Sequence, residues 1–336
     1  MAGLSMRYFL KRTVETVFLI LFVLTFLFFF FRLMPGDISD QLIFSGASPE
    51  TVAQFERRWG LNQPLHVQYY RYMVNLLQGD AGISLQYRQP VIELIQRGVF
   101  NSLILVGPAI TAGYIIGSVF GVVAGTKRGS ITEKYGITSL FFIGTFPSFF
   151  TAIVLIAIFA SYFGWVPTGG LVSSEVRRLY SGGNWWRMYF TADFLHHYIL
   201  PFSAITLRYT YLPALVMRTN VVEVVKQGFT EYQKVTGLPK TKRMFNIAKH
   251  ASLPVITLYP ASLAQGFGGL VLVETVFNWP GIGYTLVQAV FASDYPVLQF
   301  IFLLVAIWIV AGNFIVDILY GIIDPRLSIG EEAESG

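Results

Sequence analysis

The chain has 336 residues, of which 54% are hydrophobic and only 13% are charged. Soluble domains carry about 25% charged residues, so this composition indicates that the protein lies in a lipid bilayer. The lack of cysteine excludes disulfides, thiolate nucleophiles and Cys-ligated metals, and the net charge of +5 indicates loop topology more than binding to nucleic acid.

Six apolar stretches are long enough to cross a membrane, because a span needs about 20 apolar residues. In chain order they cover residues 14–34, 103–125, 137–165, 197–217, 253–275 and 296–323. The first is too long and too rich in Phe for a signal peptide and lacks a small-residue cleavage site, so we interpret it as a retained anchor. We therefore predict an all-α integral membrane protein with six transmembrane helices.

The lysines predict the orientation of these spans. All eight precede the first span or lie in the connections after the second and fourth spans: Lys11, Lys127, Lys134, Lys226, Lys234, Lys240, Lys242 and Lys249. Cytosolic loops carry an excess of Lys and Arg, so we expect both termini, the connection 218–252 and the tail 324–336 in the cytosol. The protein is then a multi-pass protein of the cell membrane, with residues 1–34 forming a cytosolic segment and the first span.

The first outward connection, residues 35–100, has the signals of a small folded cap. Ser48 and Pro49 mark the start of a helix in "SPETVAQFERRWG", and Gly60 follows its end. Apolar residues then recur at helical spacing in "PLHVQYYRYMVNLLQGD", with Gly79 as a stop signal. We expect this extracytoplasmic cap either to pack at the membrane interface or to form a docking surface for an external partner.

The second outward connection is residues 166–196. It contains "GGNWWRMYF", whose Trp185 and Trp186 suit the headgroup region of a bilayer. The same two interpretations, interfacial packing and docking of a partner, apply to this connection.

Glycine and proline recur at depth in four of the spans. They are Pro108, Gly113, Gly117, Gly121, Gly144, Pro147, Pro201, Pro213, Pro260, Gly266, Gly268 and Gly269. Small residues let helices approach closely and prolines bend them, so the pattern indicates either tight packing or a bundle that changes shape around a path. No internal repeat is visible, which argues against a secondary transporter built from inverted repeats.

Ionisable residues inside spans are costly and are therefore candidates for function. Arg208 is the deepest, and Glu274 lies near the outer end of the fifth span. Glu15 and Asp317 lie near inner ends. We interpret Arg208 either as a structural residue paired with an acid or a carbonyl, or as part of a polar pathway. The acids do not form the chain of carboxylates that a proton or sodium relay needs.

The sequence lacks the usual signatures of an enzyme. It has no phosphate-binding Walker motif, so we expect no ATP hydrolysis by the chain itself. It has no HExxH motif, and its four histidines, His66, His196, His197 and His250, form no metal-site pattern. We therefore expect a non-catalytic protein with no metal and no cofactor of its own, against the alternative of a polytopic membrane enzyme.

A short polar helix is predicted in the basic connection 218–252, within "GFTEYQKVTGLPK". Thr230 can cap its start, with Gln233 at the capping-box position. Gly237 can close its end in a left-handed turn, and Pro239 prevents the helix from restarting. Its flanks read as helical continuations of the fourth and fifth spans. Such a helix is too short to be stable alone, so we expect it to dock on a soluble partner, with an incidental loop helix as the alternative.

The stretch "EYQKVTG" resembles the EAA loop of the permease subunits of binding-protein-dependent ABC importers. Glu231 and Gly237 match the recurring Glu and Gly of that loop. Tyr232 and Gln233 depart from it, because the loop has alanine there. The longest match, "VETVFNWPGIGYTLVQAVFASDYPVLQ" at residues 273–299, is similar to the dipeptide/oligopeptide/nickel branch. The stretches "YFLKRTVETVFLILFVLTFLFFFFRLMPGD", "LNQPLHVQYYRYMVNLLQGDAGISL", "GWVPTGG", "RTNVVEVV" and "VDILYGIIDPRL" extend the resemblance over nearly the whole chain.

This resemblance implies a type-1 ABC importer permease fold, in which residues 101–323 form a five-helix core. It implies as partners a second homologous permease chain, two cytosolic ATPase subunits that bind ATP–Mg, and an extracytoplasmic solute-binding protein. The polar helix would be the ATPase-coupling helix, with Thr230, Glu231, Tyr232, Gln233, Lys234 and Gly237 as its site residues. The candidates for the pathway and the outer gate, around an outer hairpin of residues 275–296, are Arg208, Glu274, Trp279, Pro280, Gly281 and Asp294. We expect Glu274 to order this hairpin by accepting backbone hydrogen bonds.

The resemblance leaves the solute open. Peptide is the default of this branch, and import of oligosaccharide or nickel by the same machine is the alternative. A stand-alone secondary transporter, which would work without ATPases, is the alternative from a different class of protein.

Overall fold

The structure, a computed structural model, describes residues 6–33, 43, 48–60 and 62–323. This described part is helical, and the one β-pairing within it is an isolated bridge between Ile83 and Pro90. The predicted all-α class is therefore confirmed. The tail 324–336 and the Met34 end of the first matching stretch lie outside the described residues.

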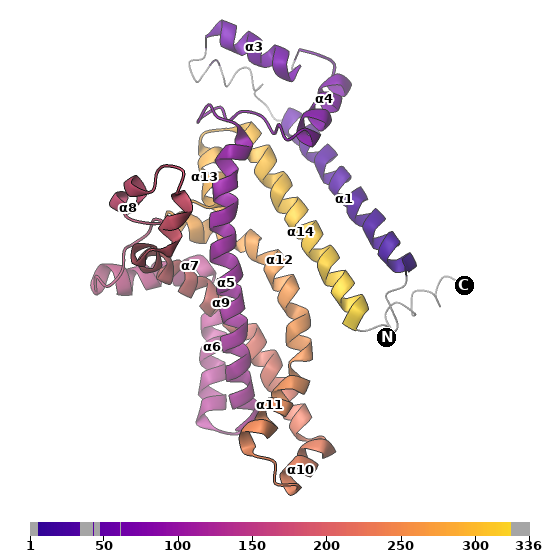
Figure 1. Ribbon diagram of the computed structural model, residues 1–336, viewed down its shortest axis with the longest axis vertical. Coiled ribbons are helices and arrows are strands. Elements are labelled where there is room, and N and C mark those ends of the chain that lie inside the picture. Colours follow the sequence, from indigo (N-terminus) through magenta and orange to yellow (C-terminus); the bar gives the residue numbers. More distant parts are fainter. Residues whose placement is uncertain (1–5, 34–42, 44–47, 61, 324–336) are drawn as a thin grey trace.

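The helices follow one another with short connections. They are α1 (Met6–Leu33), α3 (Pro49–Trp59), α4 (Leu65–Leu77), α5 (Val91–Thr126), α6 (Ile137–Thr145), α7 (Ser148–Leu155), α8 (Ser174–Leu179), α9 (Ala192–Val225), α10 (Gly228–Val235), α11 (Lys240–Ala251), α12 (Leu253–Val276), α13 (Ile282–Phe291) and α14 (Tyr295–Ile323). Two π-helical turns, η1 (Thr132–Gly136) and η2 (Ile156–Tyr162), and a 3-10 helix, η3 (Trp185–Phe190), complete the set. Figure 1 shows α10 and α11 at one end of the long axis and α3, α4 and α13 at the other; we call these the α10 end and the α13 end.

Four helices of the described part, α1, α5, α9 and α14, are each long and apolar enough to cross a membrane. Two bent helix pairs add up to two further spans. Thr132–Thr145 and Ser148–Tyr162 meet at 102°, and Leu253–Gly266 and Gly268–Val276 meet at 58°. The six predicted spans are therefore matched when each bent pair counts as one span.

The straight span predicted over residues 137–165 is wrong, because the chain turns sharply at Pro147. Phe146 is extended, with φ −69° and ψ 142°, as a residue that precedes proline prefers. The turn ends α6 at Thr145 and starts α7 at Ser148 in a new direction. The apolar pattern runs through this turn without a break, so composition alone does not reveal it.

The helices of the predicted cap are confirmed. Helix α3 begins at Pro49 and is followed by Gly60 in the left-handed region, with φ +64°, and Gly79 after α4 has φ +80°. Helix α5 begins at Val91, twelve residues before the predicted second span. The last ten residues of the range 35–100 therefore belong to a membrane-length helix.

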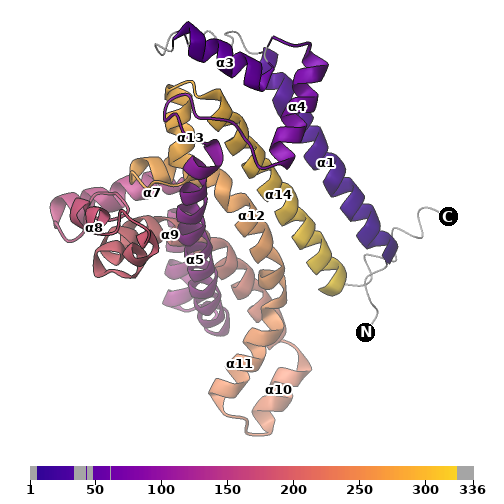
Figure 2. The same ribbon diagram turned by 45° about the horizontal axis from the view of Figure 1, so that its top comes forward.

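Helices α5 and α9 pack with their backbones in direct contact. A Cβ added to Gly117 would lie 2.3 Å from the carbonyl oxygen of Thr210, and one added to Gly121 would lie 2.5 Å from that of Ala214. This confirms tight packing as one role of the glycines. Beside this pair, α1 lies along α14 (Figures 1 and 2), where Arg12 and Asp317 form an ion pair of 3.4 Å.

Candidate functional site: the α10 helix and the 275–296 hairpin

The polar helix exists as α10, but it begins two residues before the predicted cap. Gln227, with φ −76° and ψ 142°, precedes the first helical residue Gly228. Thr230 is therefore inside the helix, and its hydroxyl donates to the carbonyl oxygens of Val225 and Gln227, both at 2.7 Å. The predicted capping box of Thr230 and Gln233 is thus wrong, because the hydroxyl is used as a donor toward the preceding turn.

The end of α10 agrees with the prediction for Gly237. This residue has φ +73°, and its N–H donates to the carbonyl oxygen of Lys234 at 3.2 Å. The N–H of Leu238 donates to the carbonyl oxygen of Gln233 at 3.1 Å, which completes a Schellman motif. Pro239 does not prevent a restart, because α11 begins directly after it at Lys240 in a new direction.

The surface of α10 and of the adjoining α11 is exposed and mixed in character. Glu231, Lys234 and Gly237 are exposed, and Tyr232 and Phe245 are each 70% exposed. A shallow pocket beside them is lined by Leu238, Thr241, Lys242, Phe245 and Asn246. Charged and aromatic side chains together on a projecting helix provide the kind of surface that a soluble partner can bind.

On its inner side, α10 is held by one aromatic contact. The ring of Phe229 lies 4.8 Å from the ring of His250 in α11. An isolated eight-residue helix is marginal in water, so its order depends on α9 and α11, from which it projects. A displacement of α10 therefore acts on both of these helices.

The 275–296 hairpin lies at the α13 end and closes on a buried carboxylate. Glu274 is fully buried. Its Oε1 accepts a hydrogen bond from the Ser102 hydroxyl at 2.6 Å, and its Oε2 accepts one from the backbone N–H of Tyr284 at 3.0 Å. The Ser102 oxygen in turn accepts the N–H of Ile282 at 2.9 Å. Glu274 thus accepts a backbone hydrogen bond, as expected, and a side-chain hydrogen bond from α5 that was not expected.

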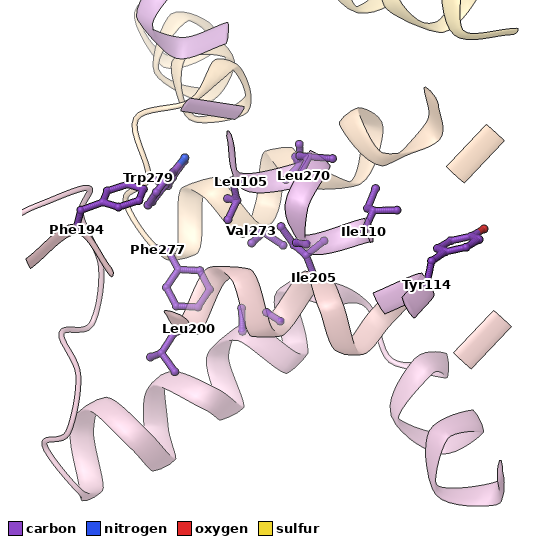
Figure 3. Packing of buried hydrophobic residues seen from close by; sticks show 14 of the residues in the cluster. Leu105, Ile110, Tyr114, Phe194, Leu200, Ile205, Leu270, Val273, Phe277 and Trp279 are labelled. Carbon is purple, nitrogen blue, oxygen red and sulfur yellow. The ribbon is translucent and has the colours of Figure 1, made fainter. Parts of the chain in front are cut away.

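Trp279 and Pro280 are fixed to the next residue of α5. The Trp279 Nε1–H donates to the carbonyl oxygen of Asn101 at 3.0 Å, and the Asn101 amide donates to the carbonyl oxygen of Pro280 at 2.7 Å. The Tyr189 hydroxyl donates to the Asn101 side-chain oxygen at 2.5 Å. Burial raises the pKa of Tyr189 to about 12, so this hydroxyl stays a neutral donor at physiological pH. The Trp279 ring is fully buried and lies 6.0 Å from the Phe194 ring (Figure 3).

Close backbone contacts leave no free space in this joint. A Cβ at Gly281 would lie 2.2 Å from Oε1 of Glu274, and one at Gly169 would lie 2.2 Å from the carbonyl oxygen of Phe277. The N–H of Gly170 donates to that same oxygen at 2.7 Å. The connection 166–196 therefore clamps the hairpin from the side opposite α5. In this arrangement Glu274, Trp279 and Gly281 are packed in a closed joint, and their role in an outer gate stays a prediction.

Asp294 lies outside that joint and holds the segment that precedes α5. Its side chain is 1% exposed. Its Oδ2 accepts hydrogen bonds from the Ser84 hydroxyl at 2.5 Å and the Gln86 N–H at 3.2 Å, and its Oδ1 accepts the Leu85 N–H at 3.1 Å. A single carboxylate thus ties the end of the cap to the end of the hairpin.

We expect Asp294→Ala to release this segment. Loss of three hydrogen bonds frees the turn around the exposed Arg88, which has φ +52°, so trypsin should cleave after Arg88 at least about tenfold faster. Limited proteolysis followed by mass spectrometry measures this rate. Cleavage after Arg57, an exposed residue of α3, serves as the control and should be unchanged; an unchanged rate at Arg88 would contradict the assignment.

Arg208 is not brought to either site. It is exposed on α9, with its guanidinium 5.9 Å from the centre of the Tyr209 ring. Among the described residues no acid lies within ion-pair distance of it, so pairing with an acid of this chain is not found there. A place along a polar pathway stays a prediction.

Sequence reasoning missed Asn101 and Ser102, which hold the hairpin. The signal was present, since two adjacent polar residues stand directly before the apolar stretch 103–125. Their partners lie 172 to 180 residues further along the chain, a distance at which no local pattern connects them.

Comparison with known proteins identifies the family. Residues 117–329 match the family described as "Binding-protein-dependent transport system inner membrane component", and residues 5–94 match the family described as its membrane component, N-terminal. The oligopeptide transport system permease protein AppB of Bacillus subtilis (strain 168) is 32% identical over 325 residues, covering 95% of this chain and 98% of that protein. The glutathione transport system permease protein GsiC of Salmonella typhimurium is 31% identical over 326 residues, covering 96% and 99%, and GsiC of Escherichia coli (strain K12) is 28% identical over the same length. With a described fold of membrane-length helices and a match across both halves of its sequence, the chain belongs to the family of binding-protein-dependent transport system inner membrane components.

Proposed function

We propose that the chain is the permease subunit of an ATP-driven importer that takes up a peptide-like solute delivered by an external binding protein. The observation that carries this proposal is α10, an exposed and separately closed helix that projects from the ends of two membrane-length helices. Such a helix converts the motion of a docked partner into motion of the spans. The chain then has no catalytic activity of its own and binds no cofactor.

The proposed assembly contains a second homologous permease, two ATPase subunits at the α10 end, and a solute-binding protein at the α13 end. Each ATPase pair would bind ATP–Mg, and α10 of this chain would enter a groove on one of them. The lysines of residues 218–252 support a cytosolic α10 end. Both termini would then lie in the cytosol, with the cap and the hairpin outside.

The names of the relatives favour a peptide-like solute over oligosaccharide or nickel. AppB is named for oligopeptide and GsiC for glutathione, which is itself a small peptide. A secondary transporter has little support in the described acids of the spans. Glu274 is fixed inside the hairpin joint, and Asp317 is paired with Arg12, so these two acids are not arranged along a common path.

Co-purification tests the proposal. The chain is expressed with its genomic neighbours, tagged, extracted gently in detergent, and its bound partners are identified by mass spectrometry. We expect a second permease and two P-loop ATPases, and a peptide among the compounds released from the denatured binding protein. Recovery of this chain alone, still able to transport in vesicles without ATP, would favour a secondary transporter.

A further inference from the structure

An ion pair joins α9 to the turn between α5 and α6 near the α10 end. The Arg218 guanidinium of α9 donates to Oε1 of Glu133 in η1, through Nε at 2.8 Å and through a closer contact from Nη2. The other oxygen of Glu133 accepts the N–H of Gly129, and the Ser130 hydroxyl accepts the N–H of Glu133 at 3.2 Å. Glu133 is 8% exposed. Its own turn therefore holds the carboxylate in place for Arg218.

The contact between α5 and α9 continues from this ion pair toward the α13 end. A Cβ at Gly125 would lie 2.7 Å from the Val221 side chain, and the contacts at Gly121 and Gly117 follow one and two turns further on. Beyond them, the Tyr198 hydroxyl donates to the carbonyl oxygen of Ile104 at 2.9 Å. Interiors packed this closely transmit displacement without much compression. The two helices therefore behave as one body.

This body has one working site at each end. At one end, α9 leads within two residues into α10. At the other end, Asn101 and Ser102 of α5 hold the hairpin through Trp279 and Glu274. The connection from α10 to α5 depends on contact with α9 at the α10 end, and there the Arg218–Glu133 pair is the one ion pair between α9 and the η1 turn among the described residues.

We infer that Arg218 and Glu133 are positioning residues for energy coupling, which transfer a displacement of α10 from α9 to α5 and so to the 275–296 hairpin. This inference rests on the proposed function, because it requires an ATPase that moves α10. A partly buried ion pair is weak evidence of net stability, since desolvation offsets much of the attraction. Its orienting effect is a separate property that removal of one partner abolishes.

Hydrogen exchange of the assembled complex tests this role. The complex of this chain with its partner permease and ATPases is measured with and without ATP plus vanadate, which holds the ATPases closed. In the parent complex we expect exchange to change in residues 228–240 and in residues 275–296. In Arg218→Met and in Glu133→Gln the change in 228–240 should persist, whereas that in 275–296 should fall by about tenfold.

Two further variants separate coupling from folding. Arg218→Lys keeps the charge and one donor toward Glu133, so it should restore much of the response in residues 275–296. Arg12→Met removes a comparable guanidinium ion pair between α1 and α14 and should leave both responses intact. Glu133→Gln preserves the shape and the acceptor for Gly129, so it decides the matter if Arg218→Met does not assemble.

The outcomes are distinct. A response of residues 275–296 that stays undiminished in both Arg218→Met and Glu133→Gln would overturn the inference and leave the proposed function intact. A parent complex in which ATP plus vanadate changes neither segment would overturn the proposed function, and the inference with it.

Discussion

Gly237→Pro should reduce ATP hydrolysis stimulated by the loaded binding protein to its unstimulated level while the helices stay folded. Proline fixes φ near about −65°, whereas Gly237 has φ +73° and donates its N–H to Lys234. The substitution therefore breaks the Schellman motif and reorients the end of α10. Because the end of α10 is exposed and a Cβ at Gly237 would contact nothing within 4 Å, the core between α5 and α9 is not touched.

Glu231→Arg approaches the same surface through charge. Glu231 lies in the first turn of α10 and is exposed. Reversal of its charge costs little in folding, since an exposed acid at a helix N-terminus contributes only about 0.3–1 kcal/mol. It should nevertheless abolish the stimulated ATPase activity, because like or unlike charge at a docking surface decides which partner binds.

The measurement compares stimulated ATPase activity and thermal unfolding of the same purified complexes. Gly228→Ala is a matched control at the other end of α10, since Gly228 does not have positive φ and has no atoms near its added Cβ. It should keep full stimulation. Normal stimulation in both Gly237→Pro and Glu231→Arg would refute the assignment of α10 as the coupling helix.

The parts of the fold that follow from local chemistry were predictable from the sequence. Gly60, Gly79 and Gly237 were expected at helix ends, and all three have positive φ, because a left-handed residue is cheapest as glycine. Pro49 starts α3 for a similarly local reason, as its fixed φ suits the first turn. Such positions need no knowledge of the rest of the chain.

The parts that depend on distant partners were not predictable. The bend at Pro147 leaves the apolar pattern intact, so composition reads residues 137–165 as one span. The Thr230 hydroxyl had two possible uses, as an acceptor at a cap or as a donor to the preceding turn, and the extended backbone of Gln227 decides between them. Asn101 and Ser102 acquire their role only when the hairpin folds back onto α5.

Glu274 was recognised as a candidate from its cost inside a span, and its partners show what substitution should do. Ser102 has one hydroxyl hydrogen, which it donates to Glu274, while it accepts the N–H of Ile282. A Glu274→Gln side chain has one oxygen for two donors, Ser102 and the N–H of Tyr284. One of the two hydrogen bonds must therefore be lost or replaced by a contact between donors.

We expect Glu274→Gln to lower the free energy of unfolding by about 1–3 kcal/mol, the cost of a buried polar group without its partner. The amides of Ile282 and Tyr284 should exchange hydrogen faster, since their acceptors are disturbed. Glu274→Ala should be worse on both counts, because it also leaves a cavity below Gly281. Thermal unfolding in detergent and hydrogen exchange of residues 281–288 measure the two effects.

Thr285→Val is the control for this prediction. The Thr285 hydroxyl donates only within its own turn, to the carbonyl oxygen of Gly281 at 2.8 Å, so its loss should leave the joint with α5 intact. If Glu274→Gln unfolds at the parent temperature and its hairpin amides exchange no faster than those of Thr285→Val, then Glu274 does not order the hairpin. The expected result instead makes this carboxylate the element that fixes the hairpin to α5, and thereby to the helix pair that ends at α10.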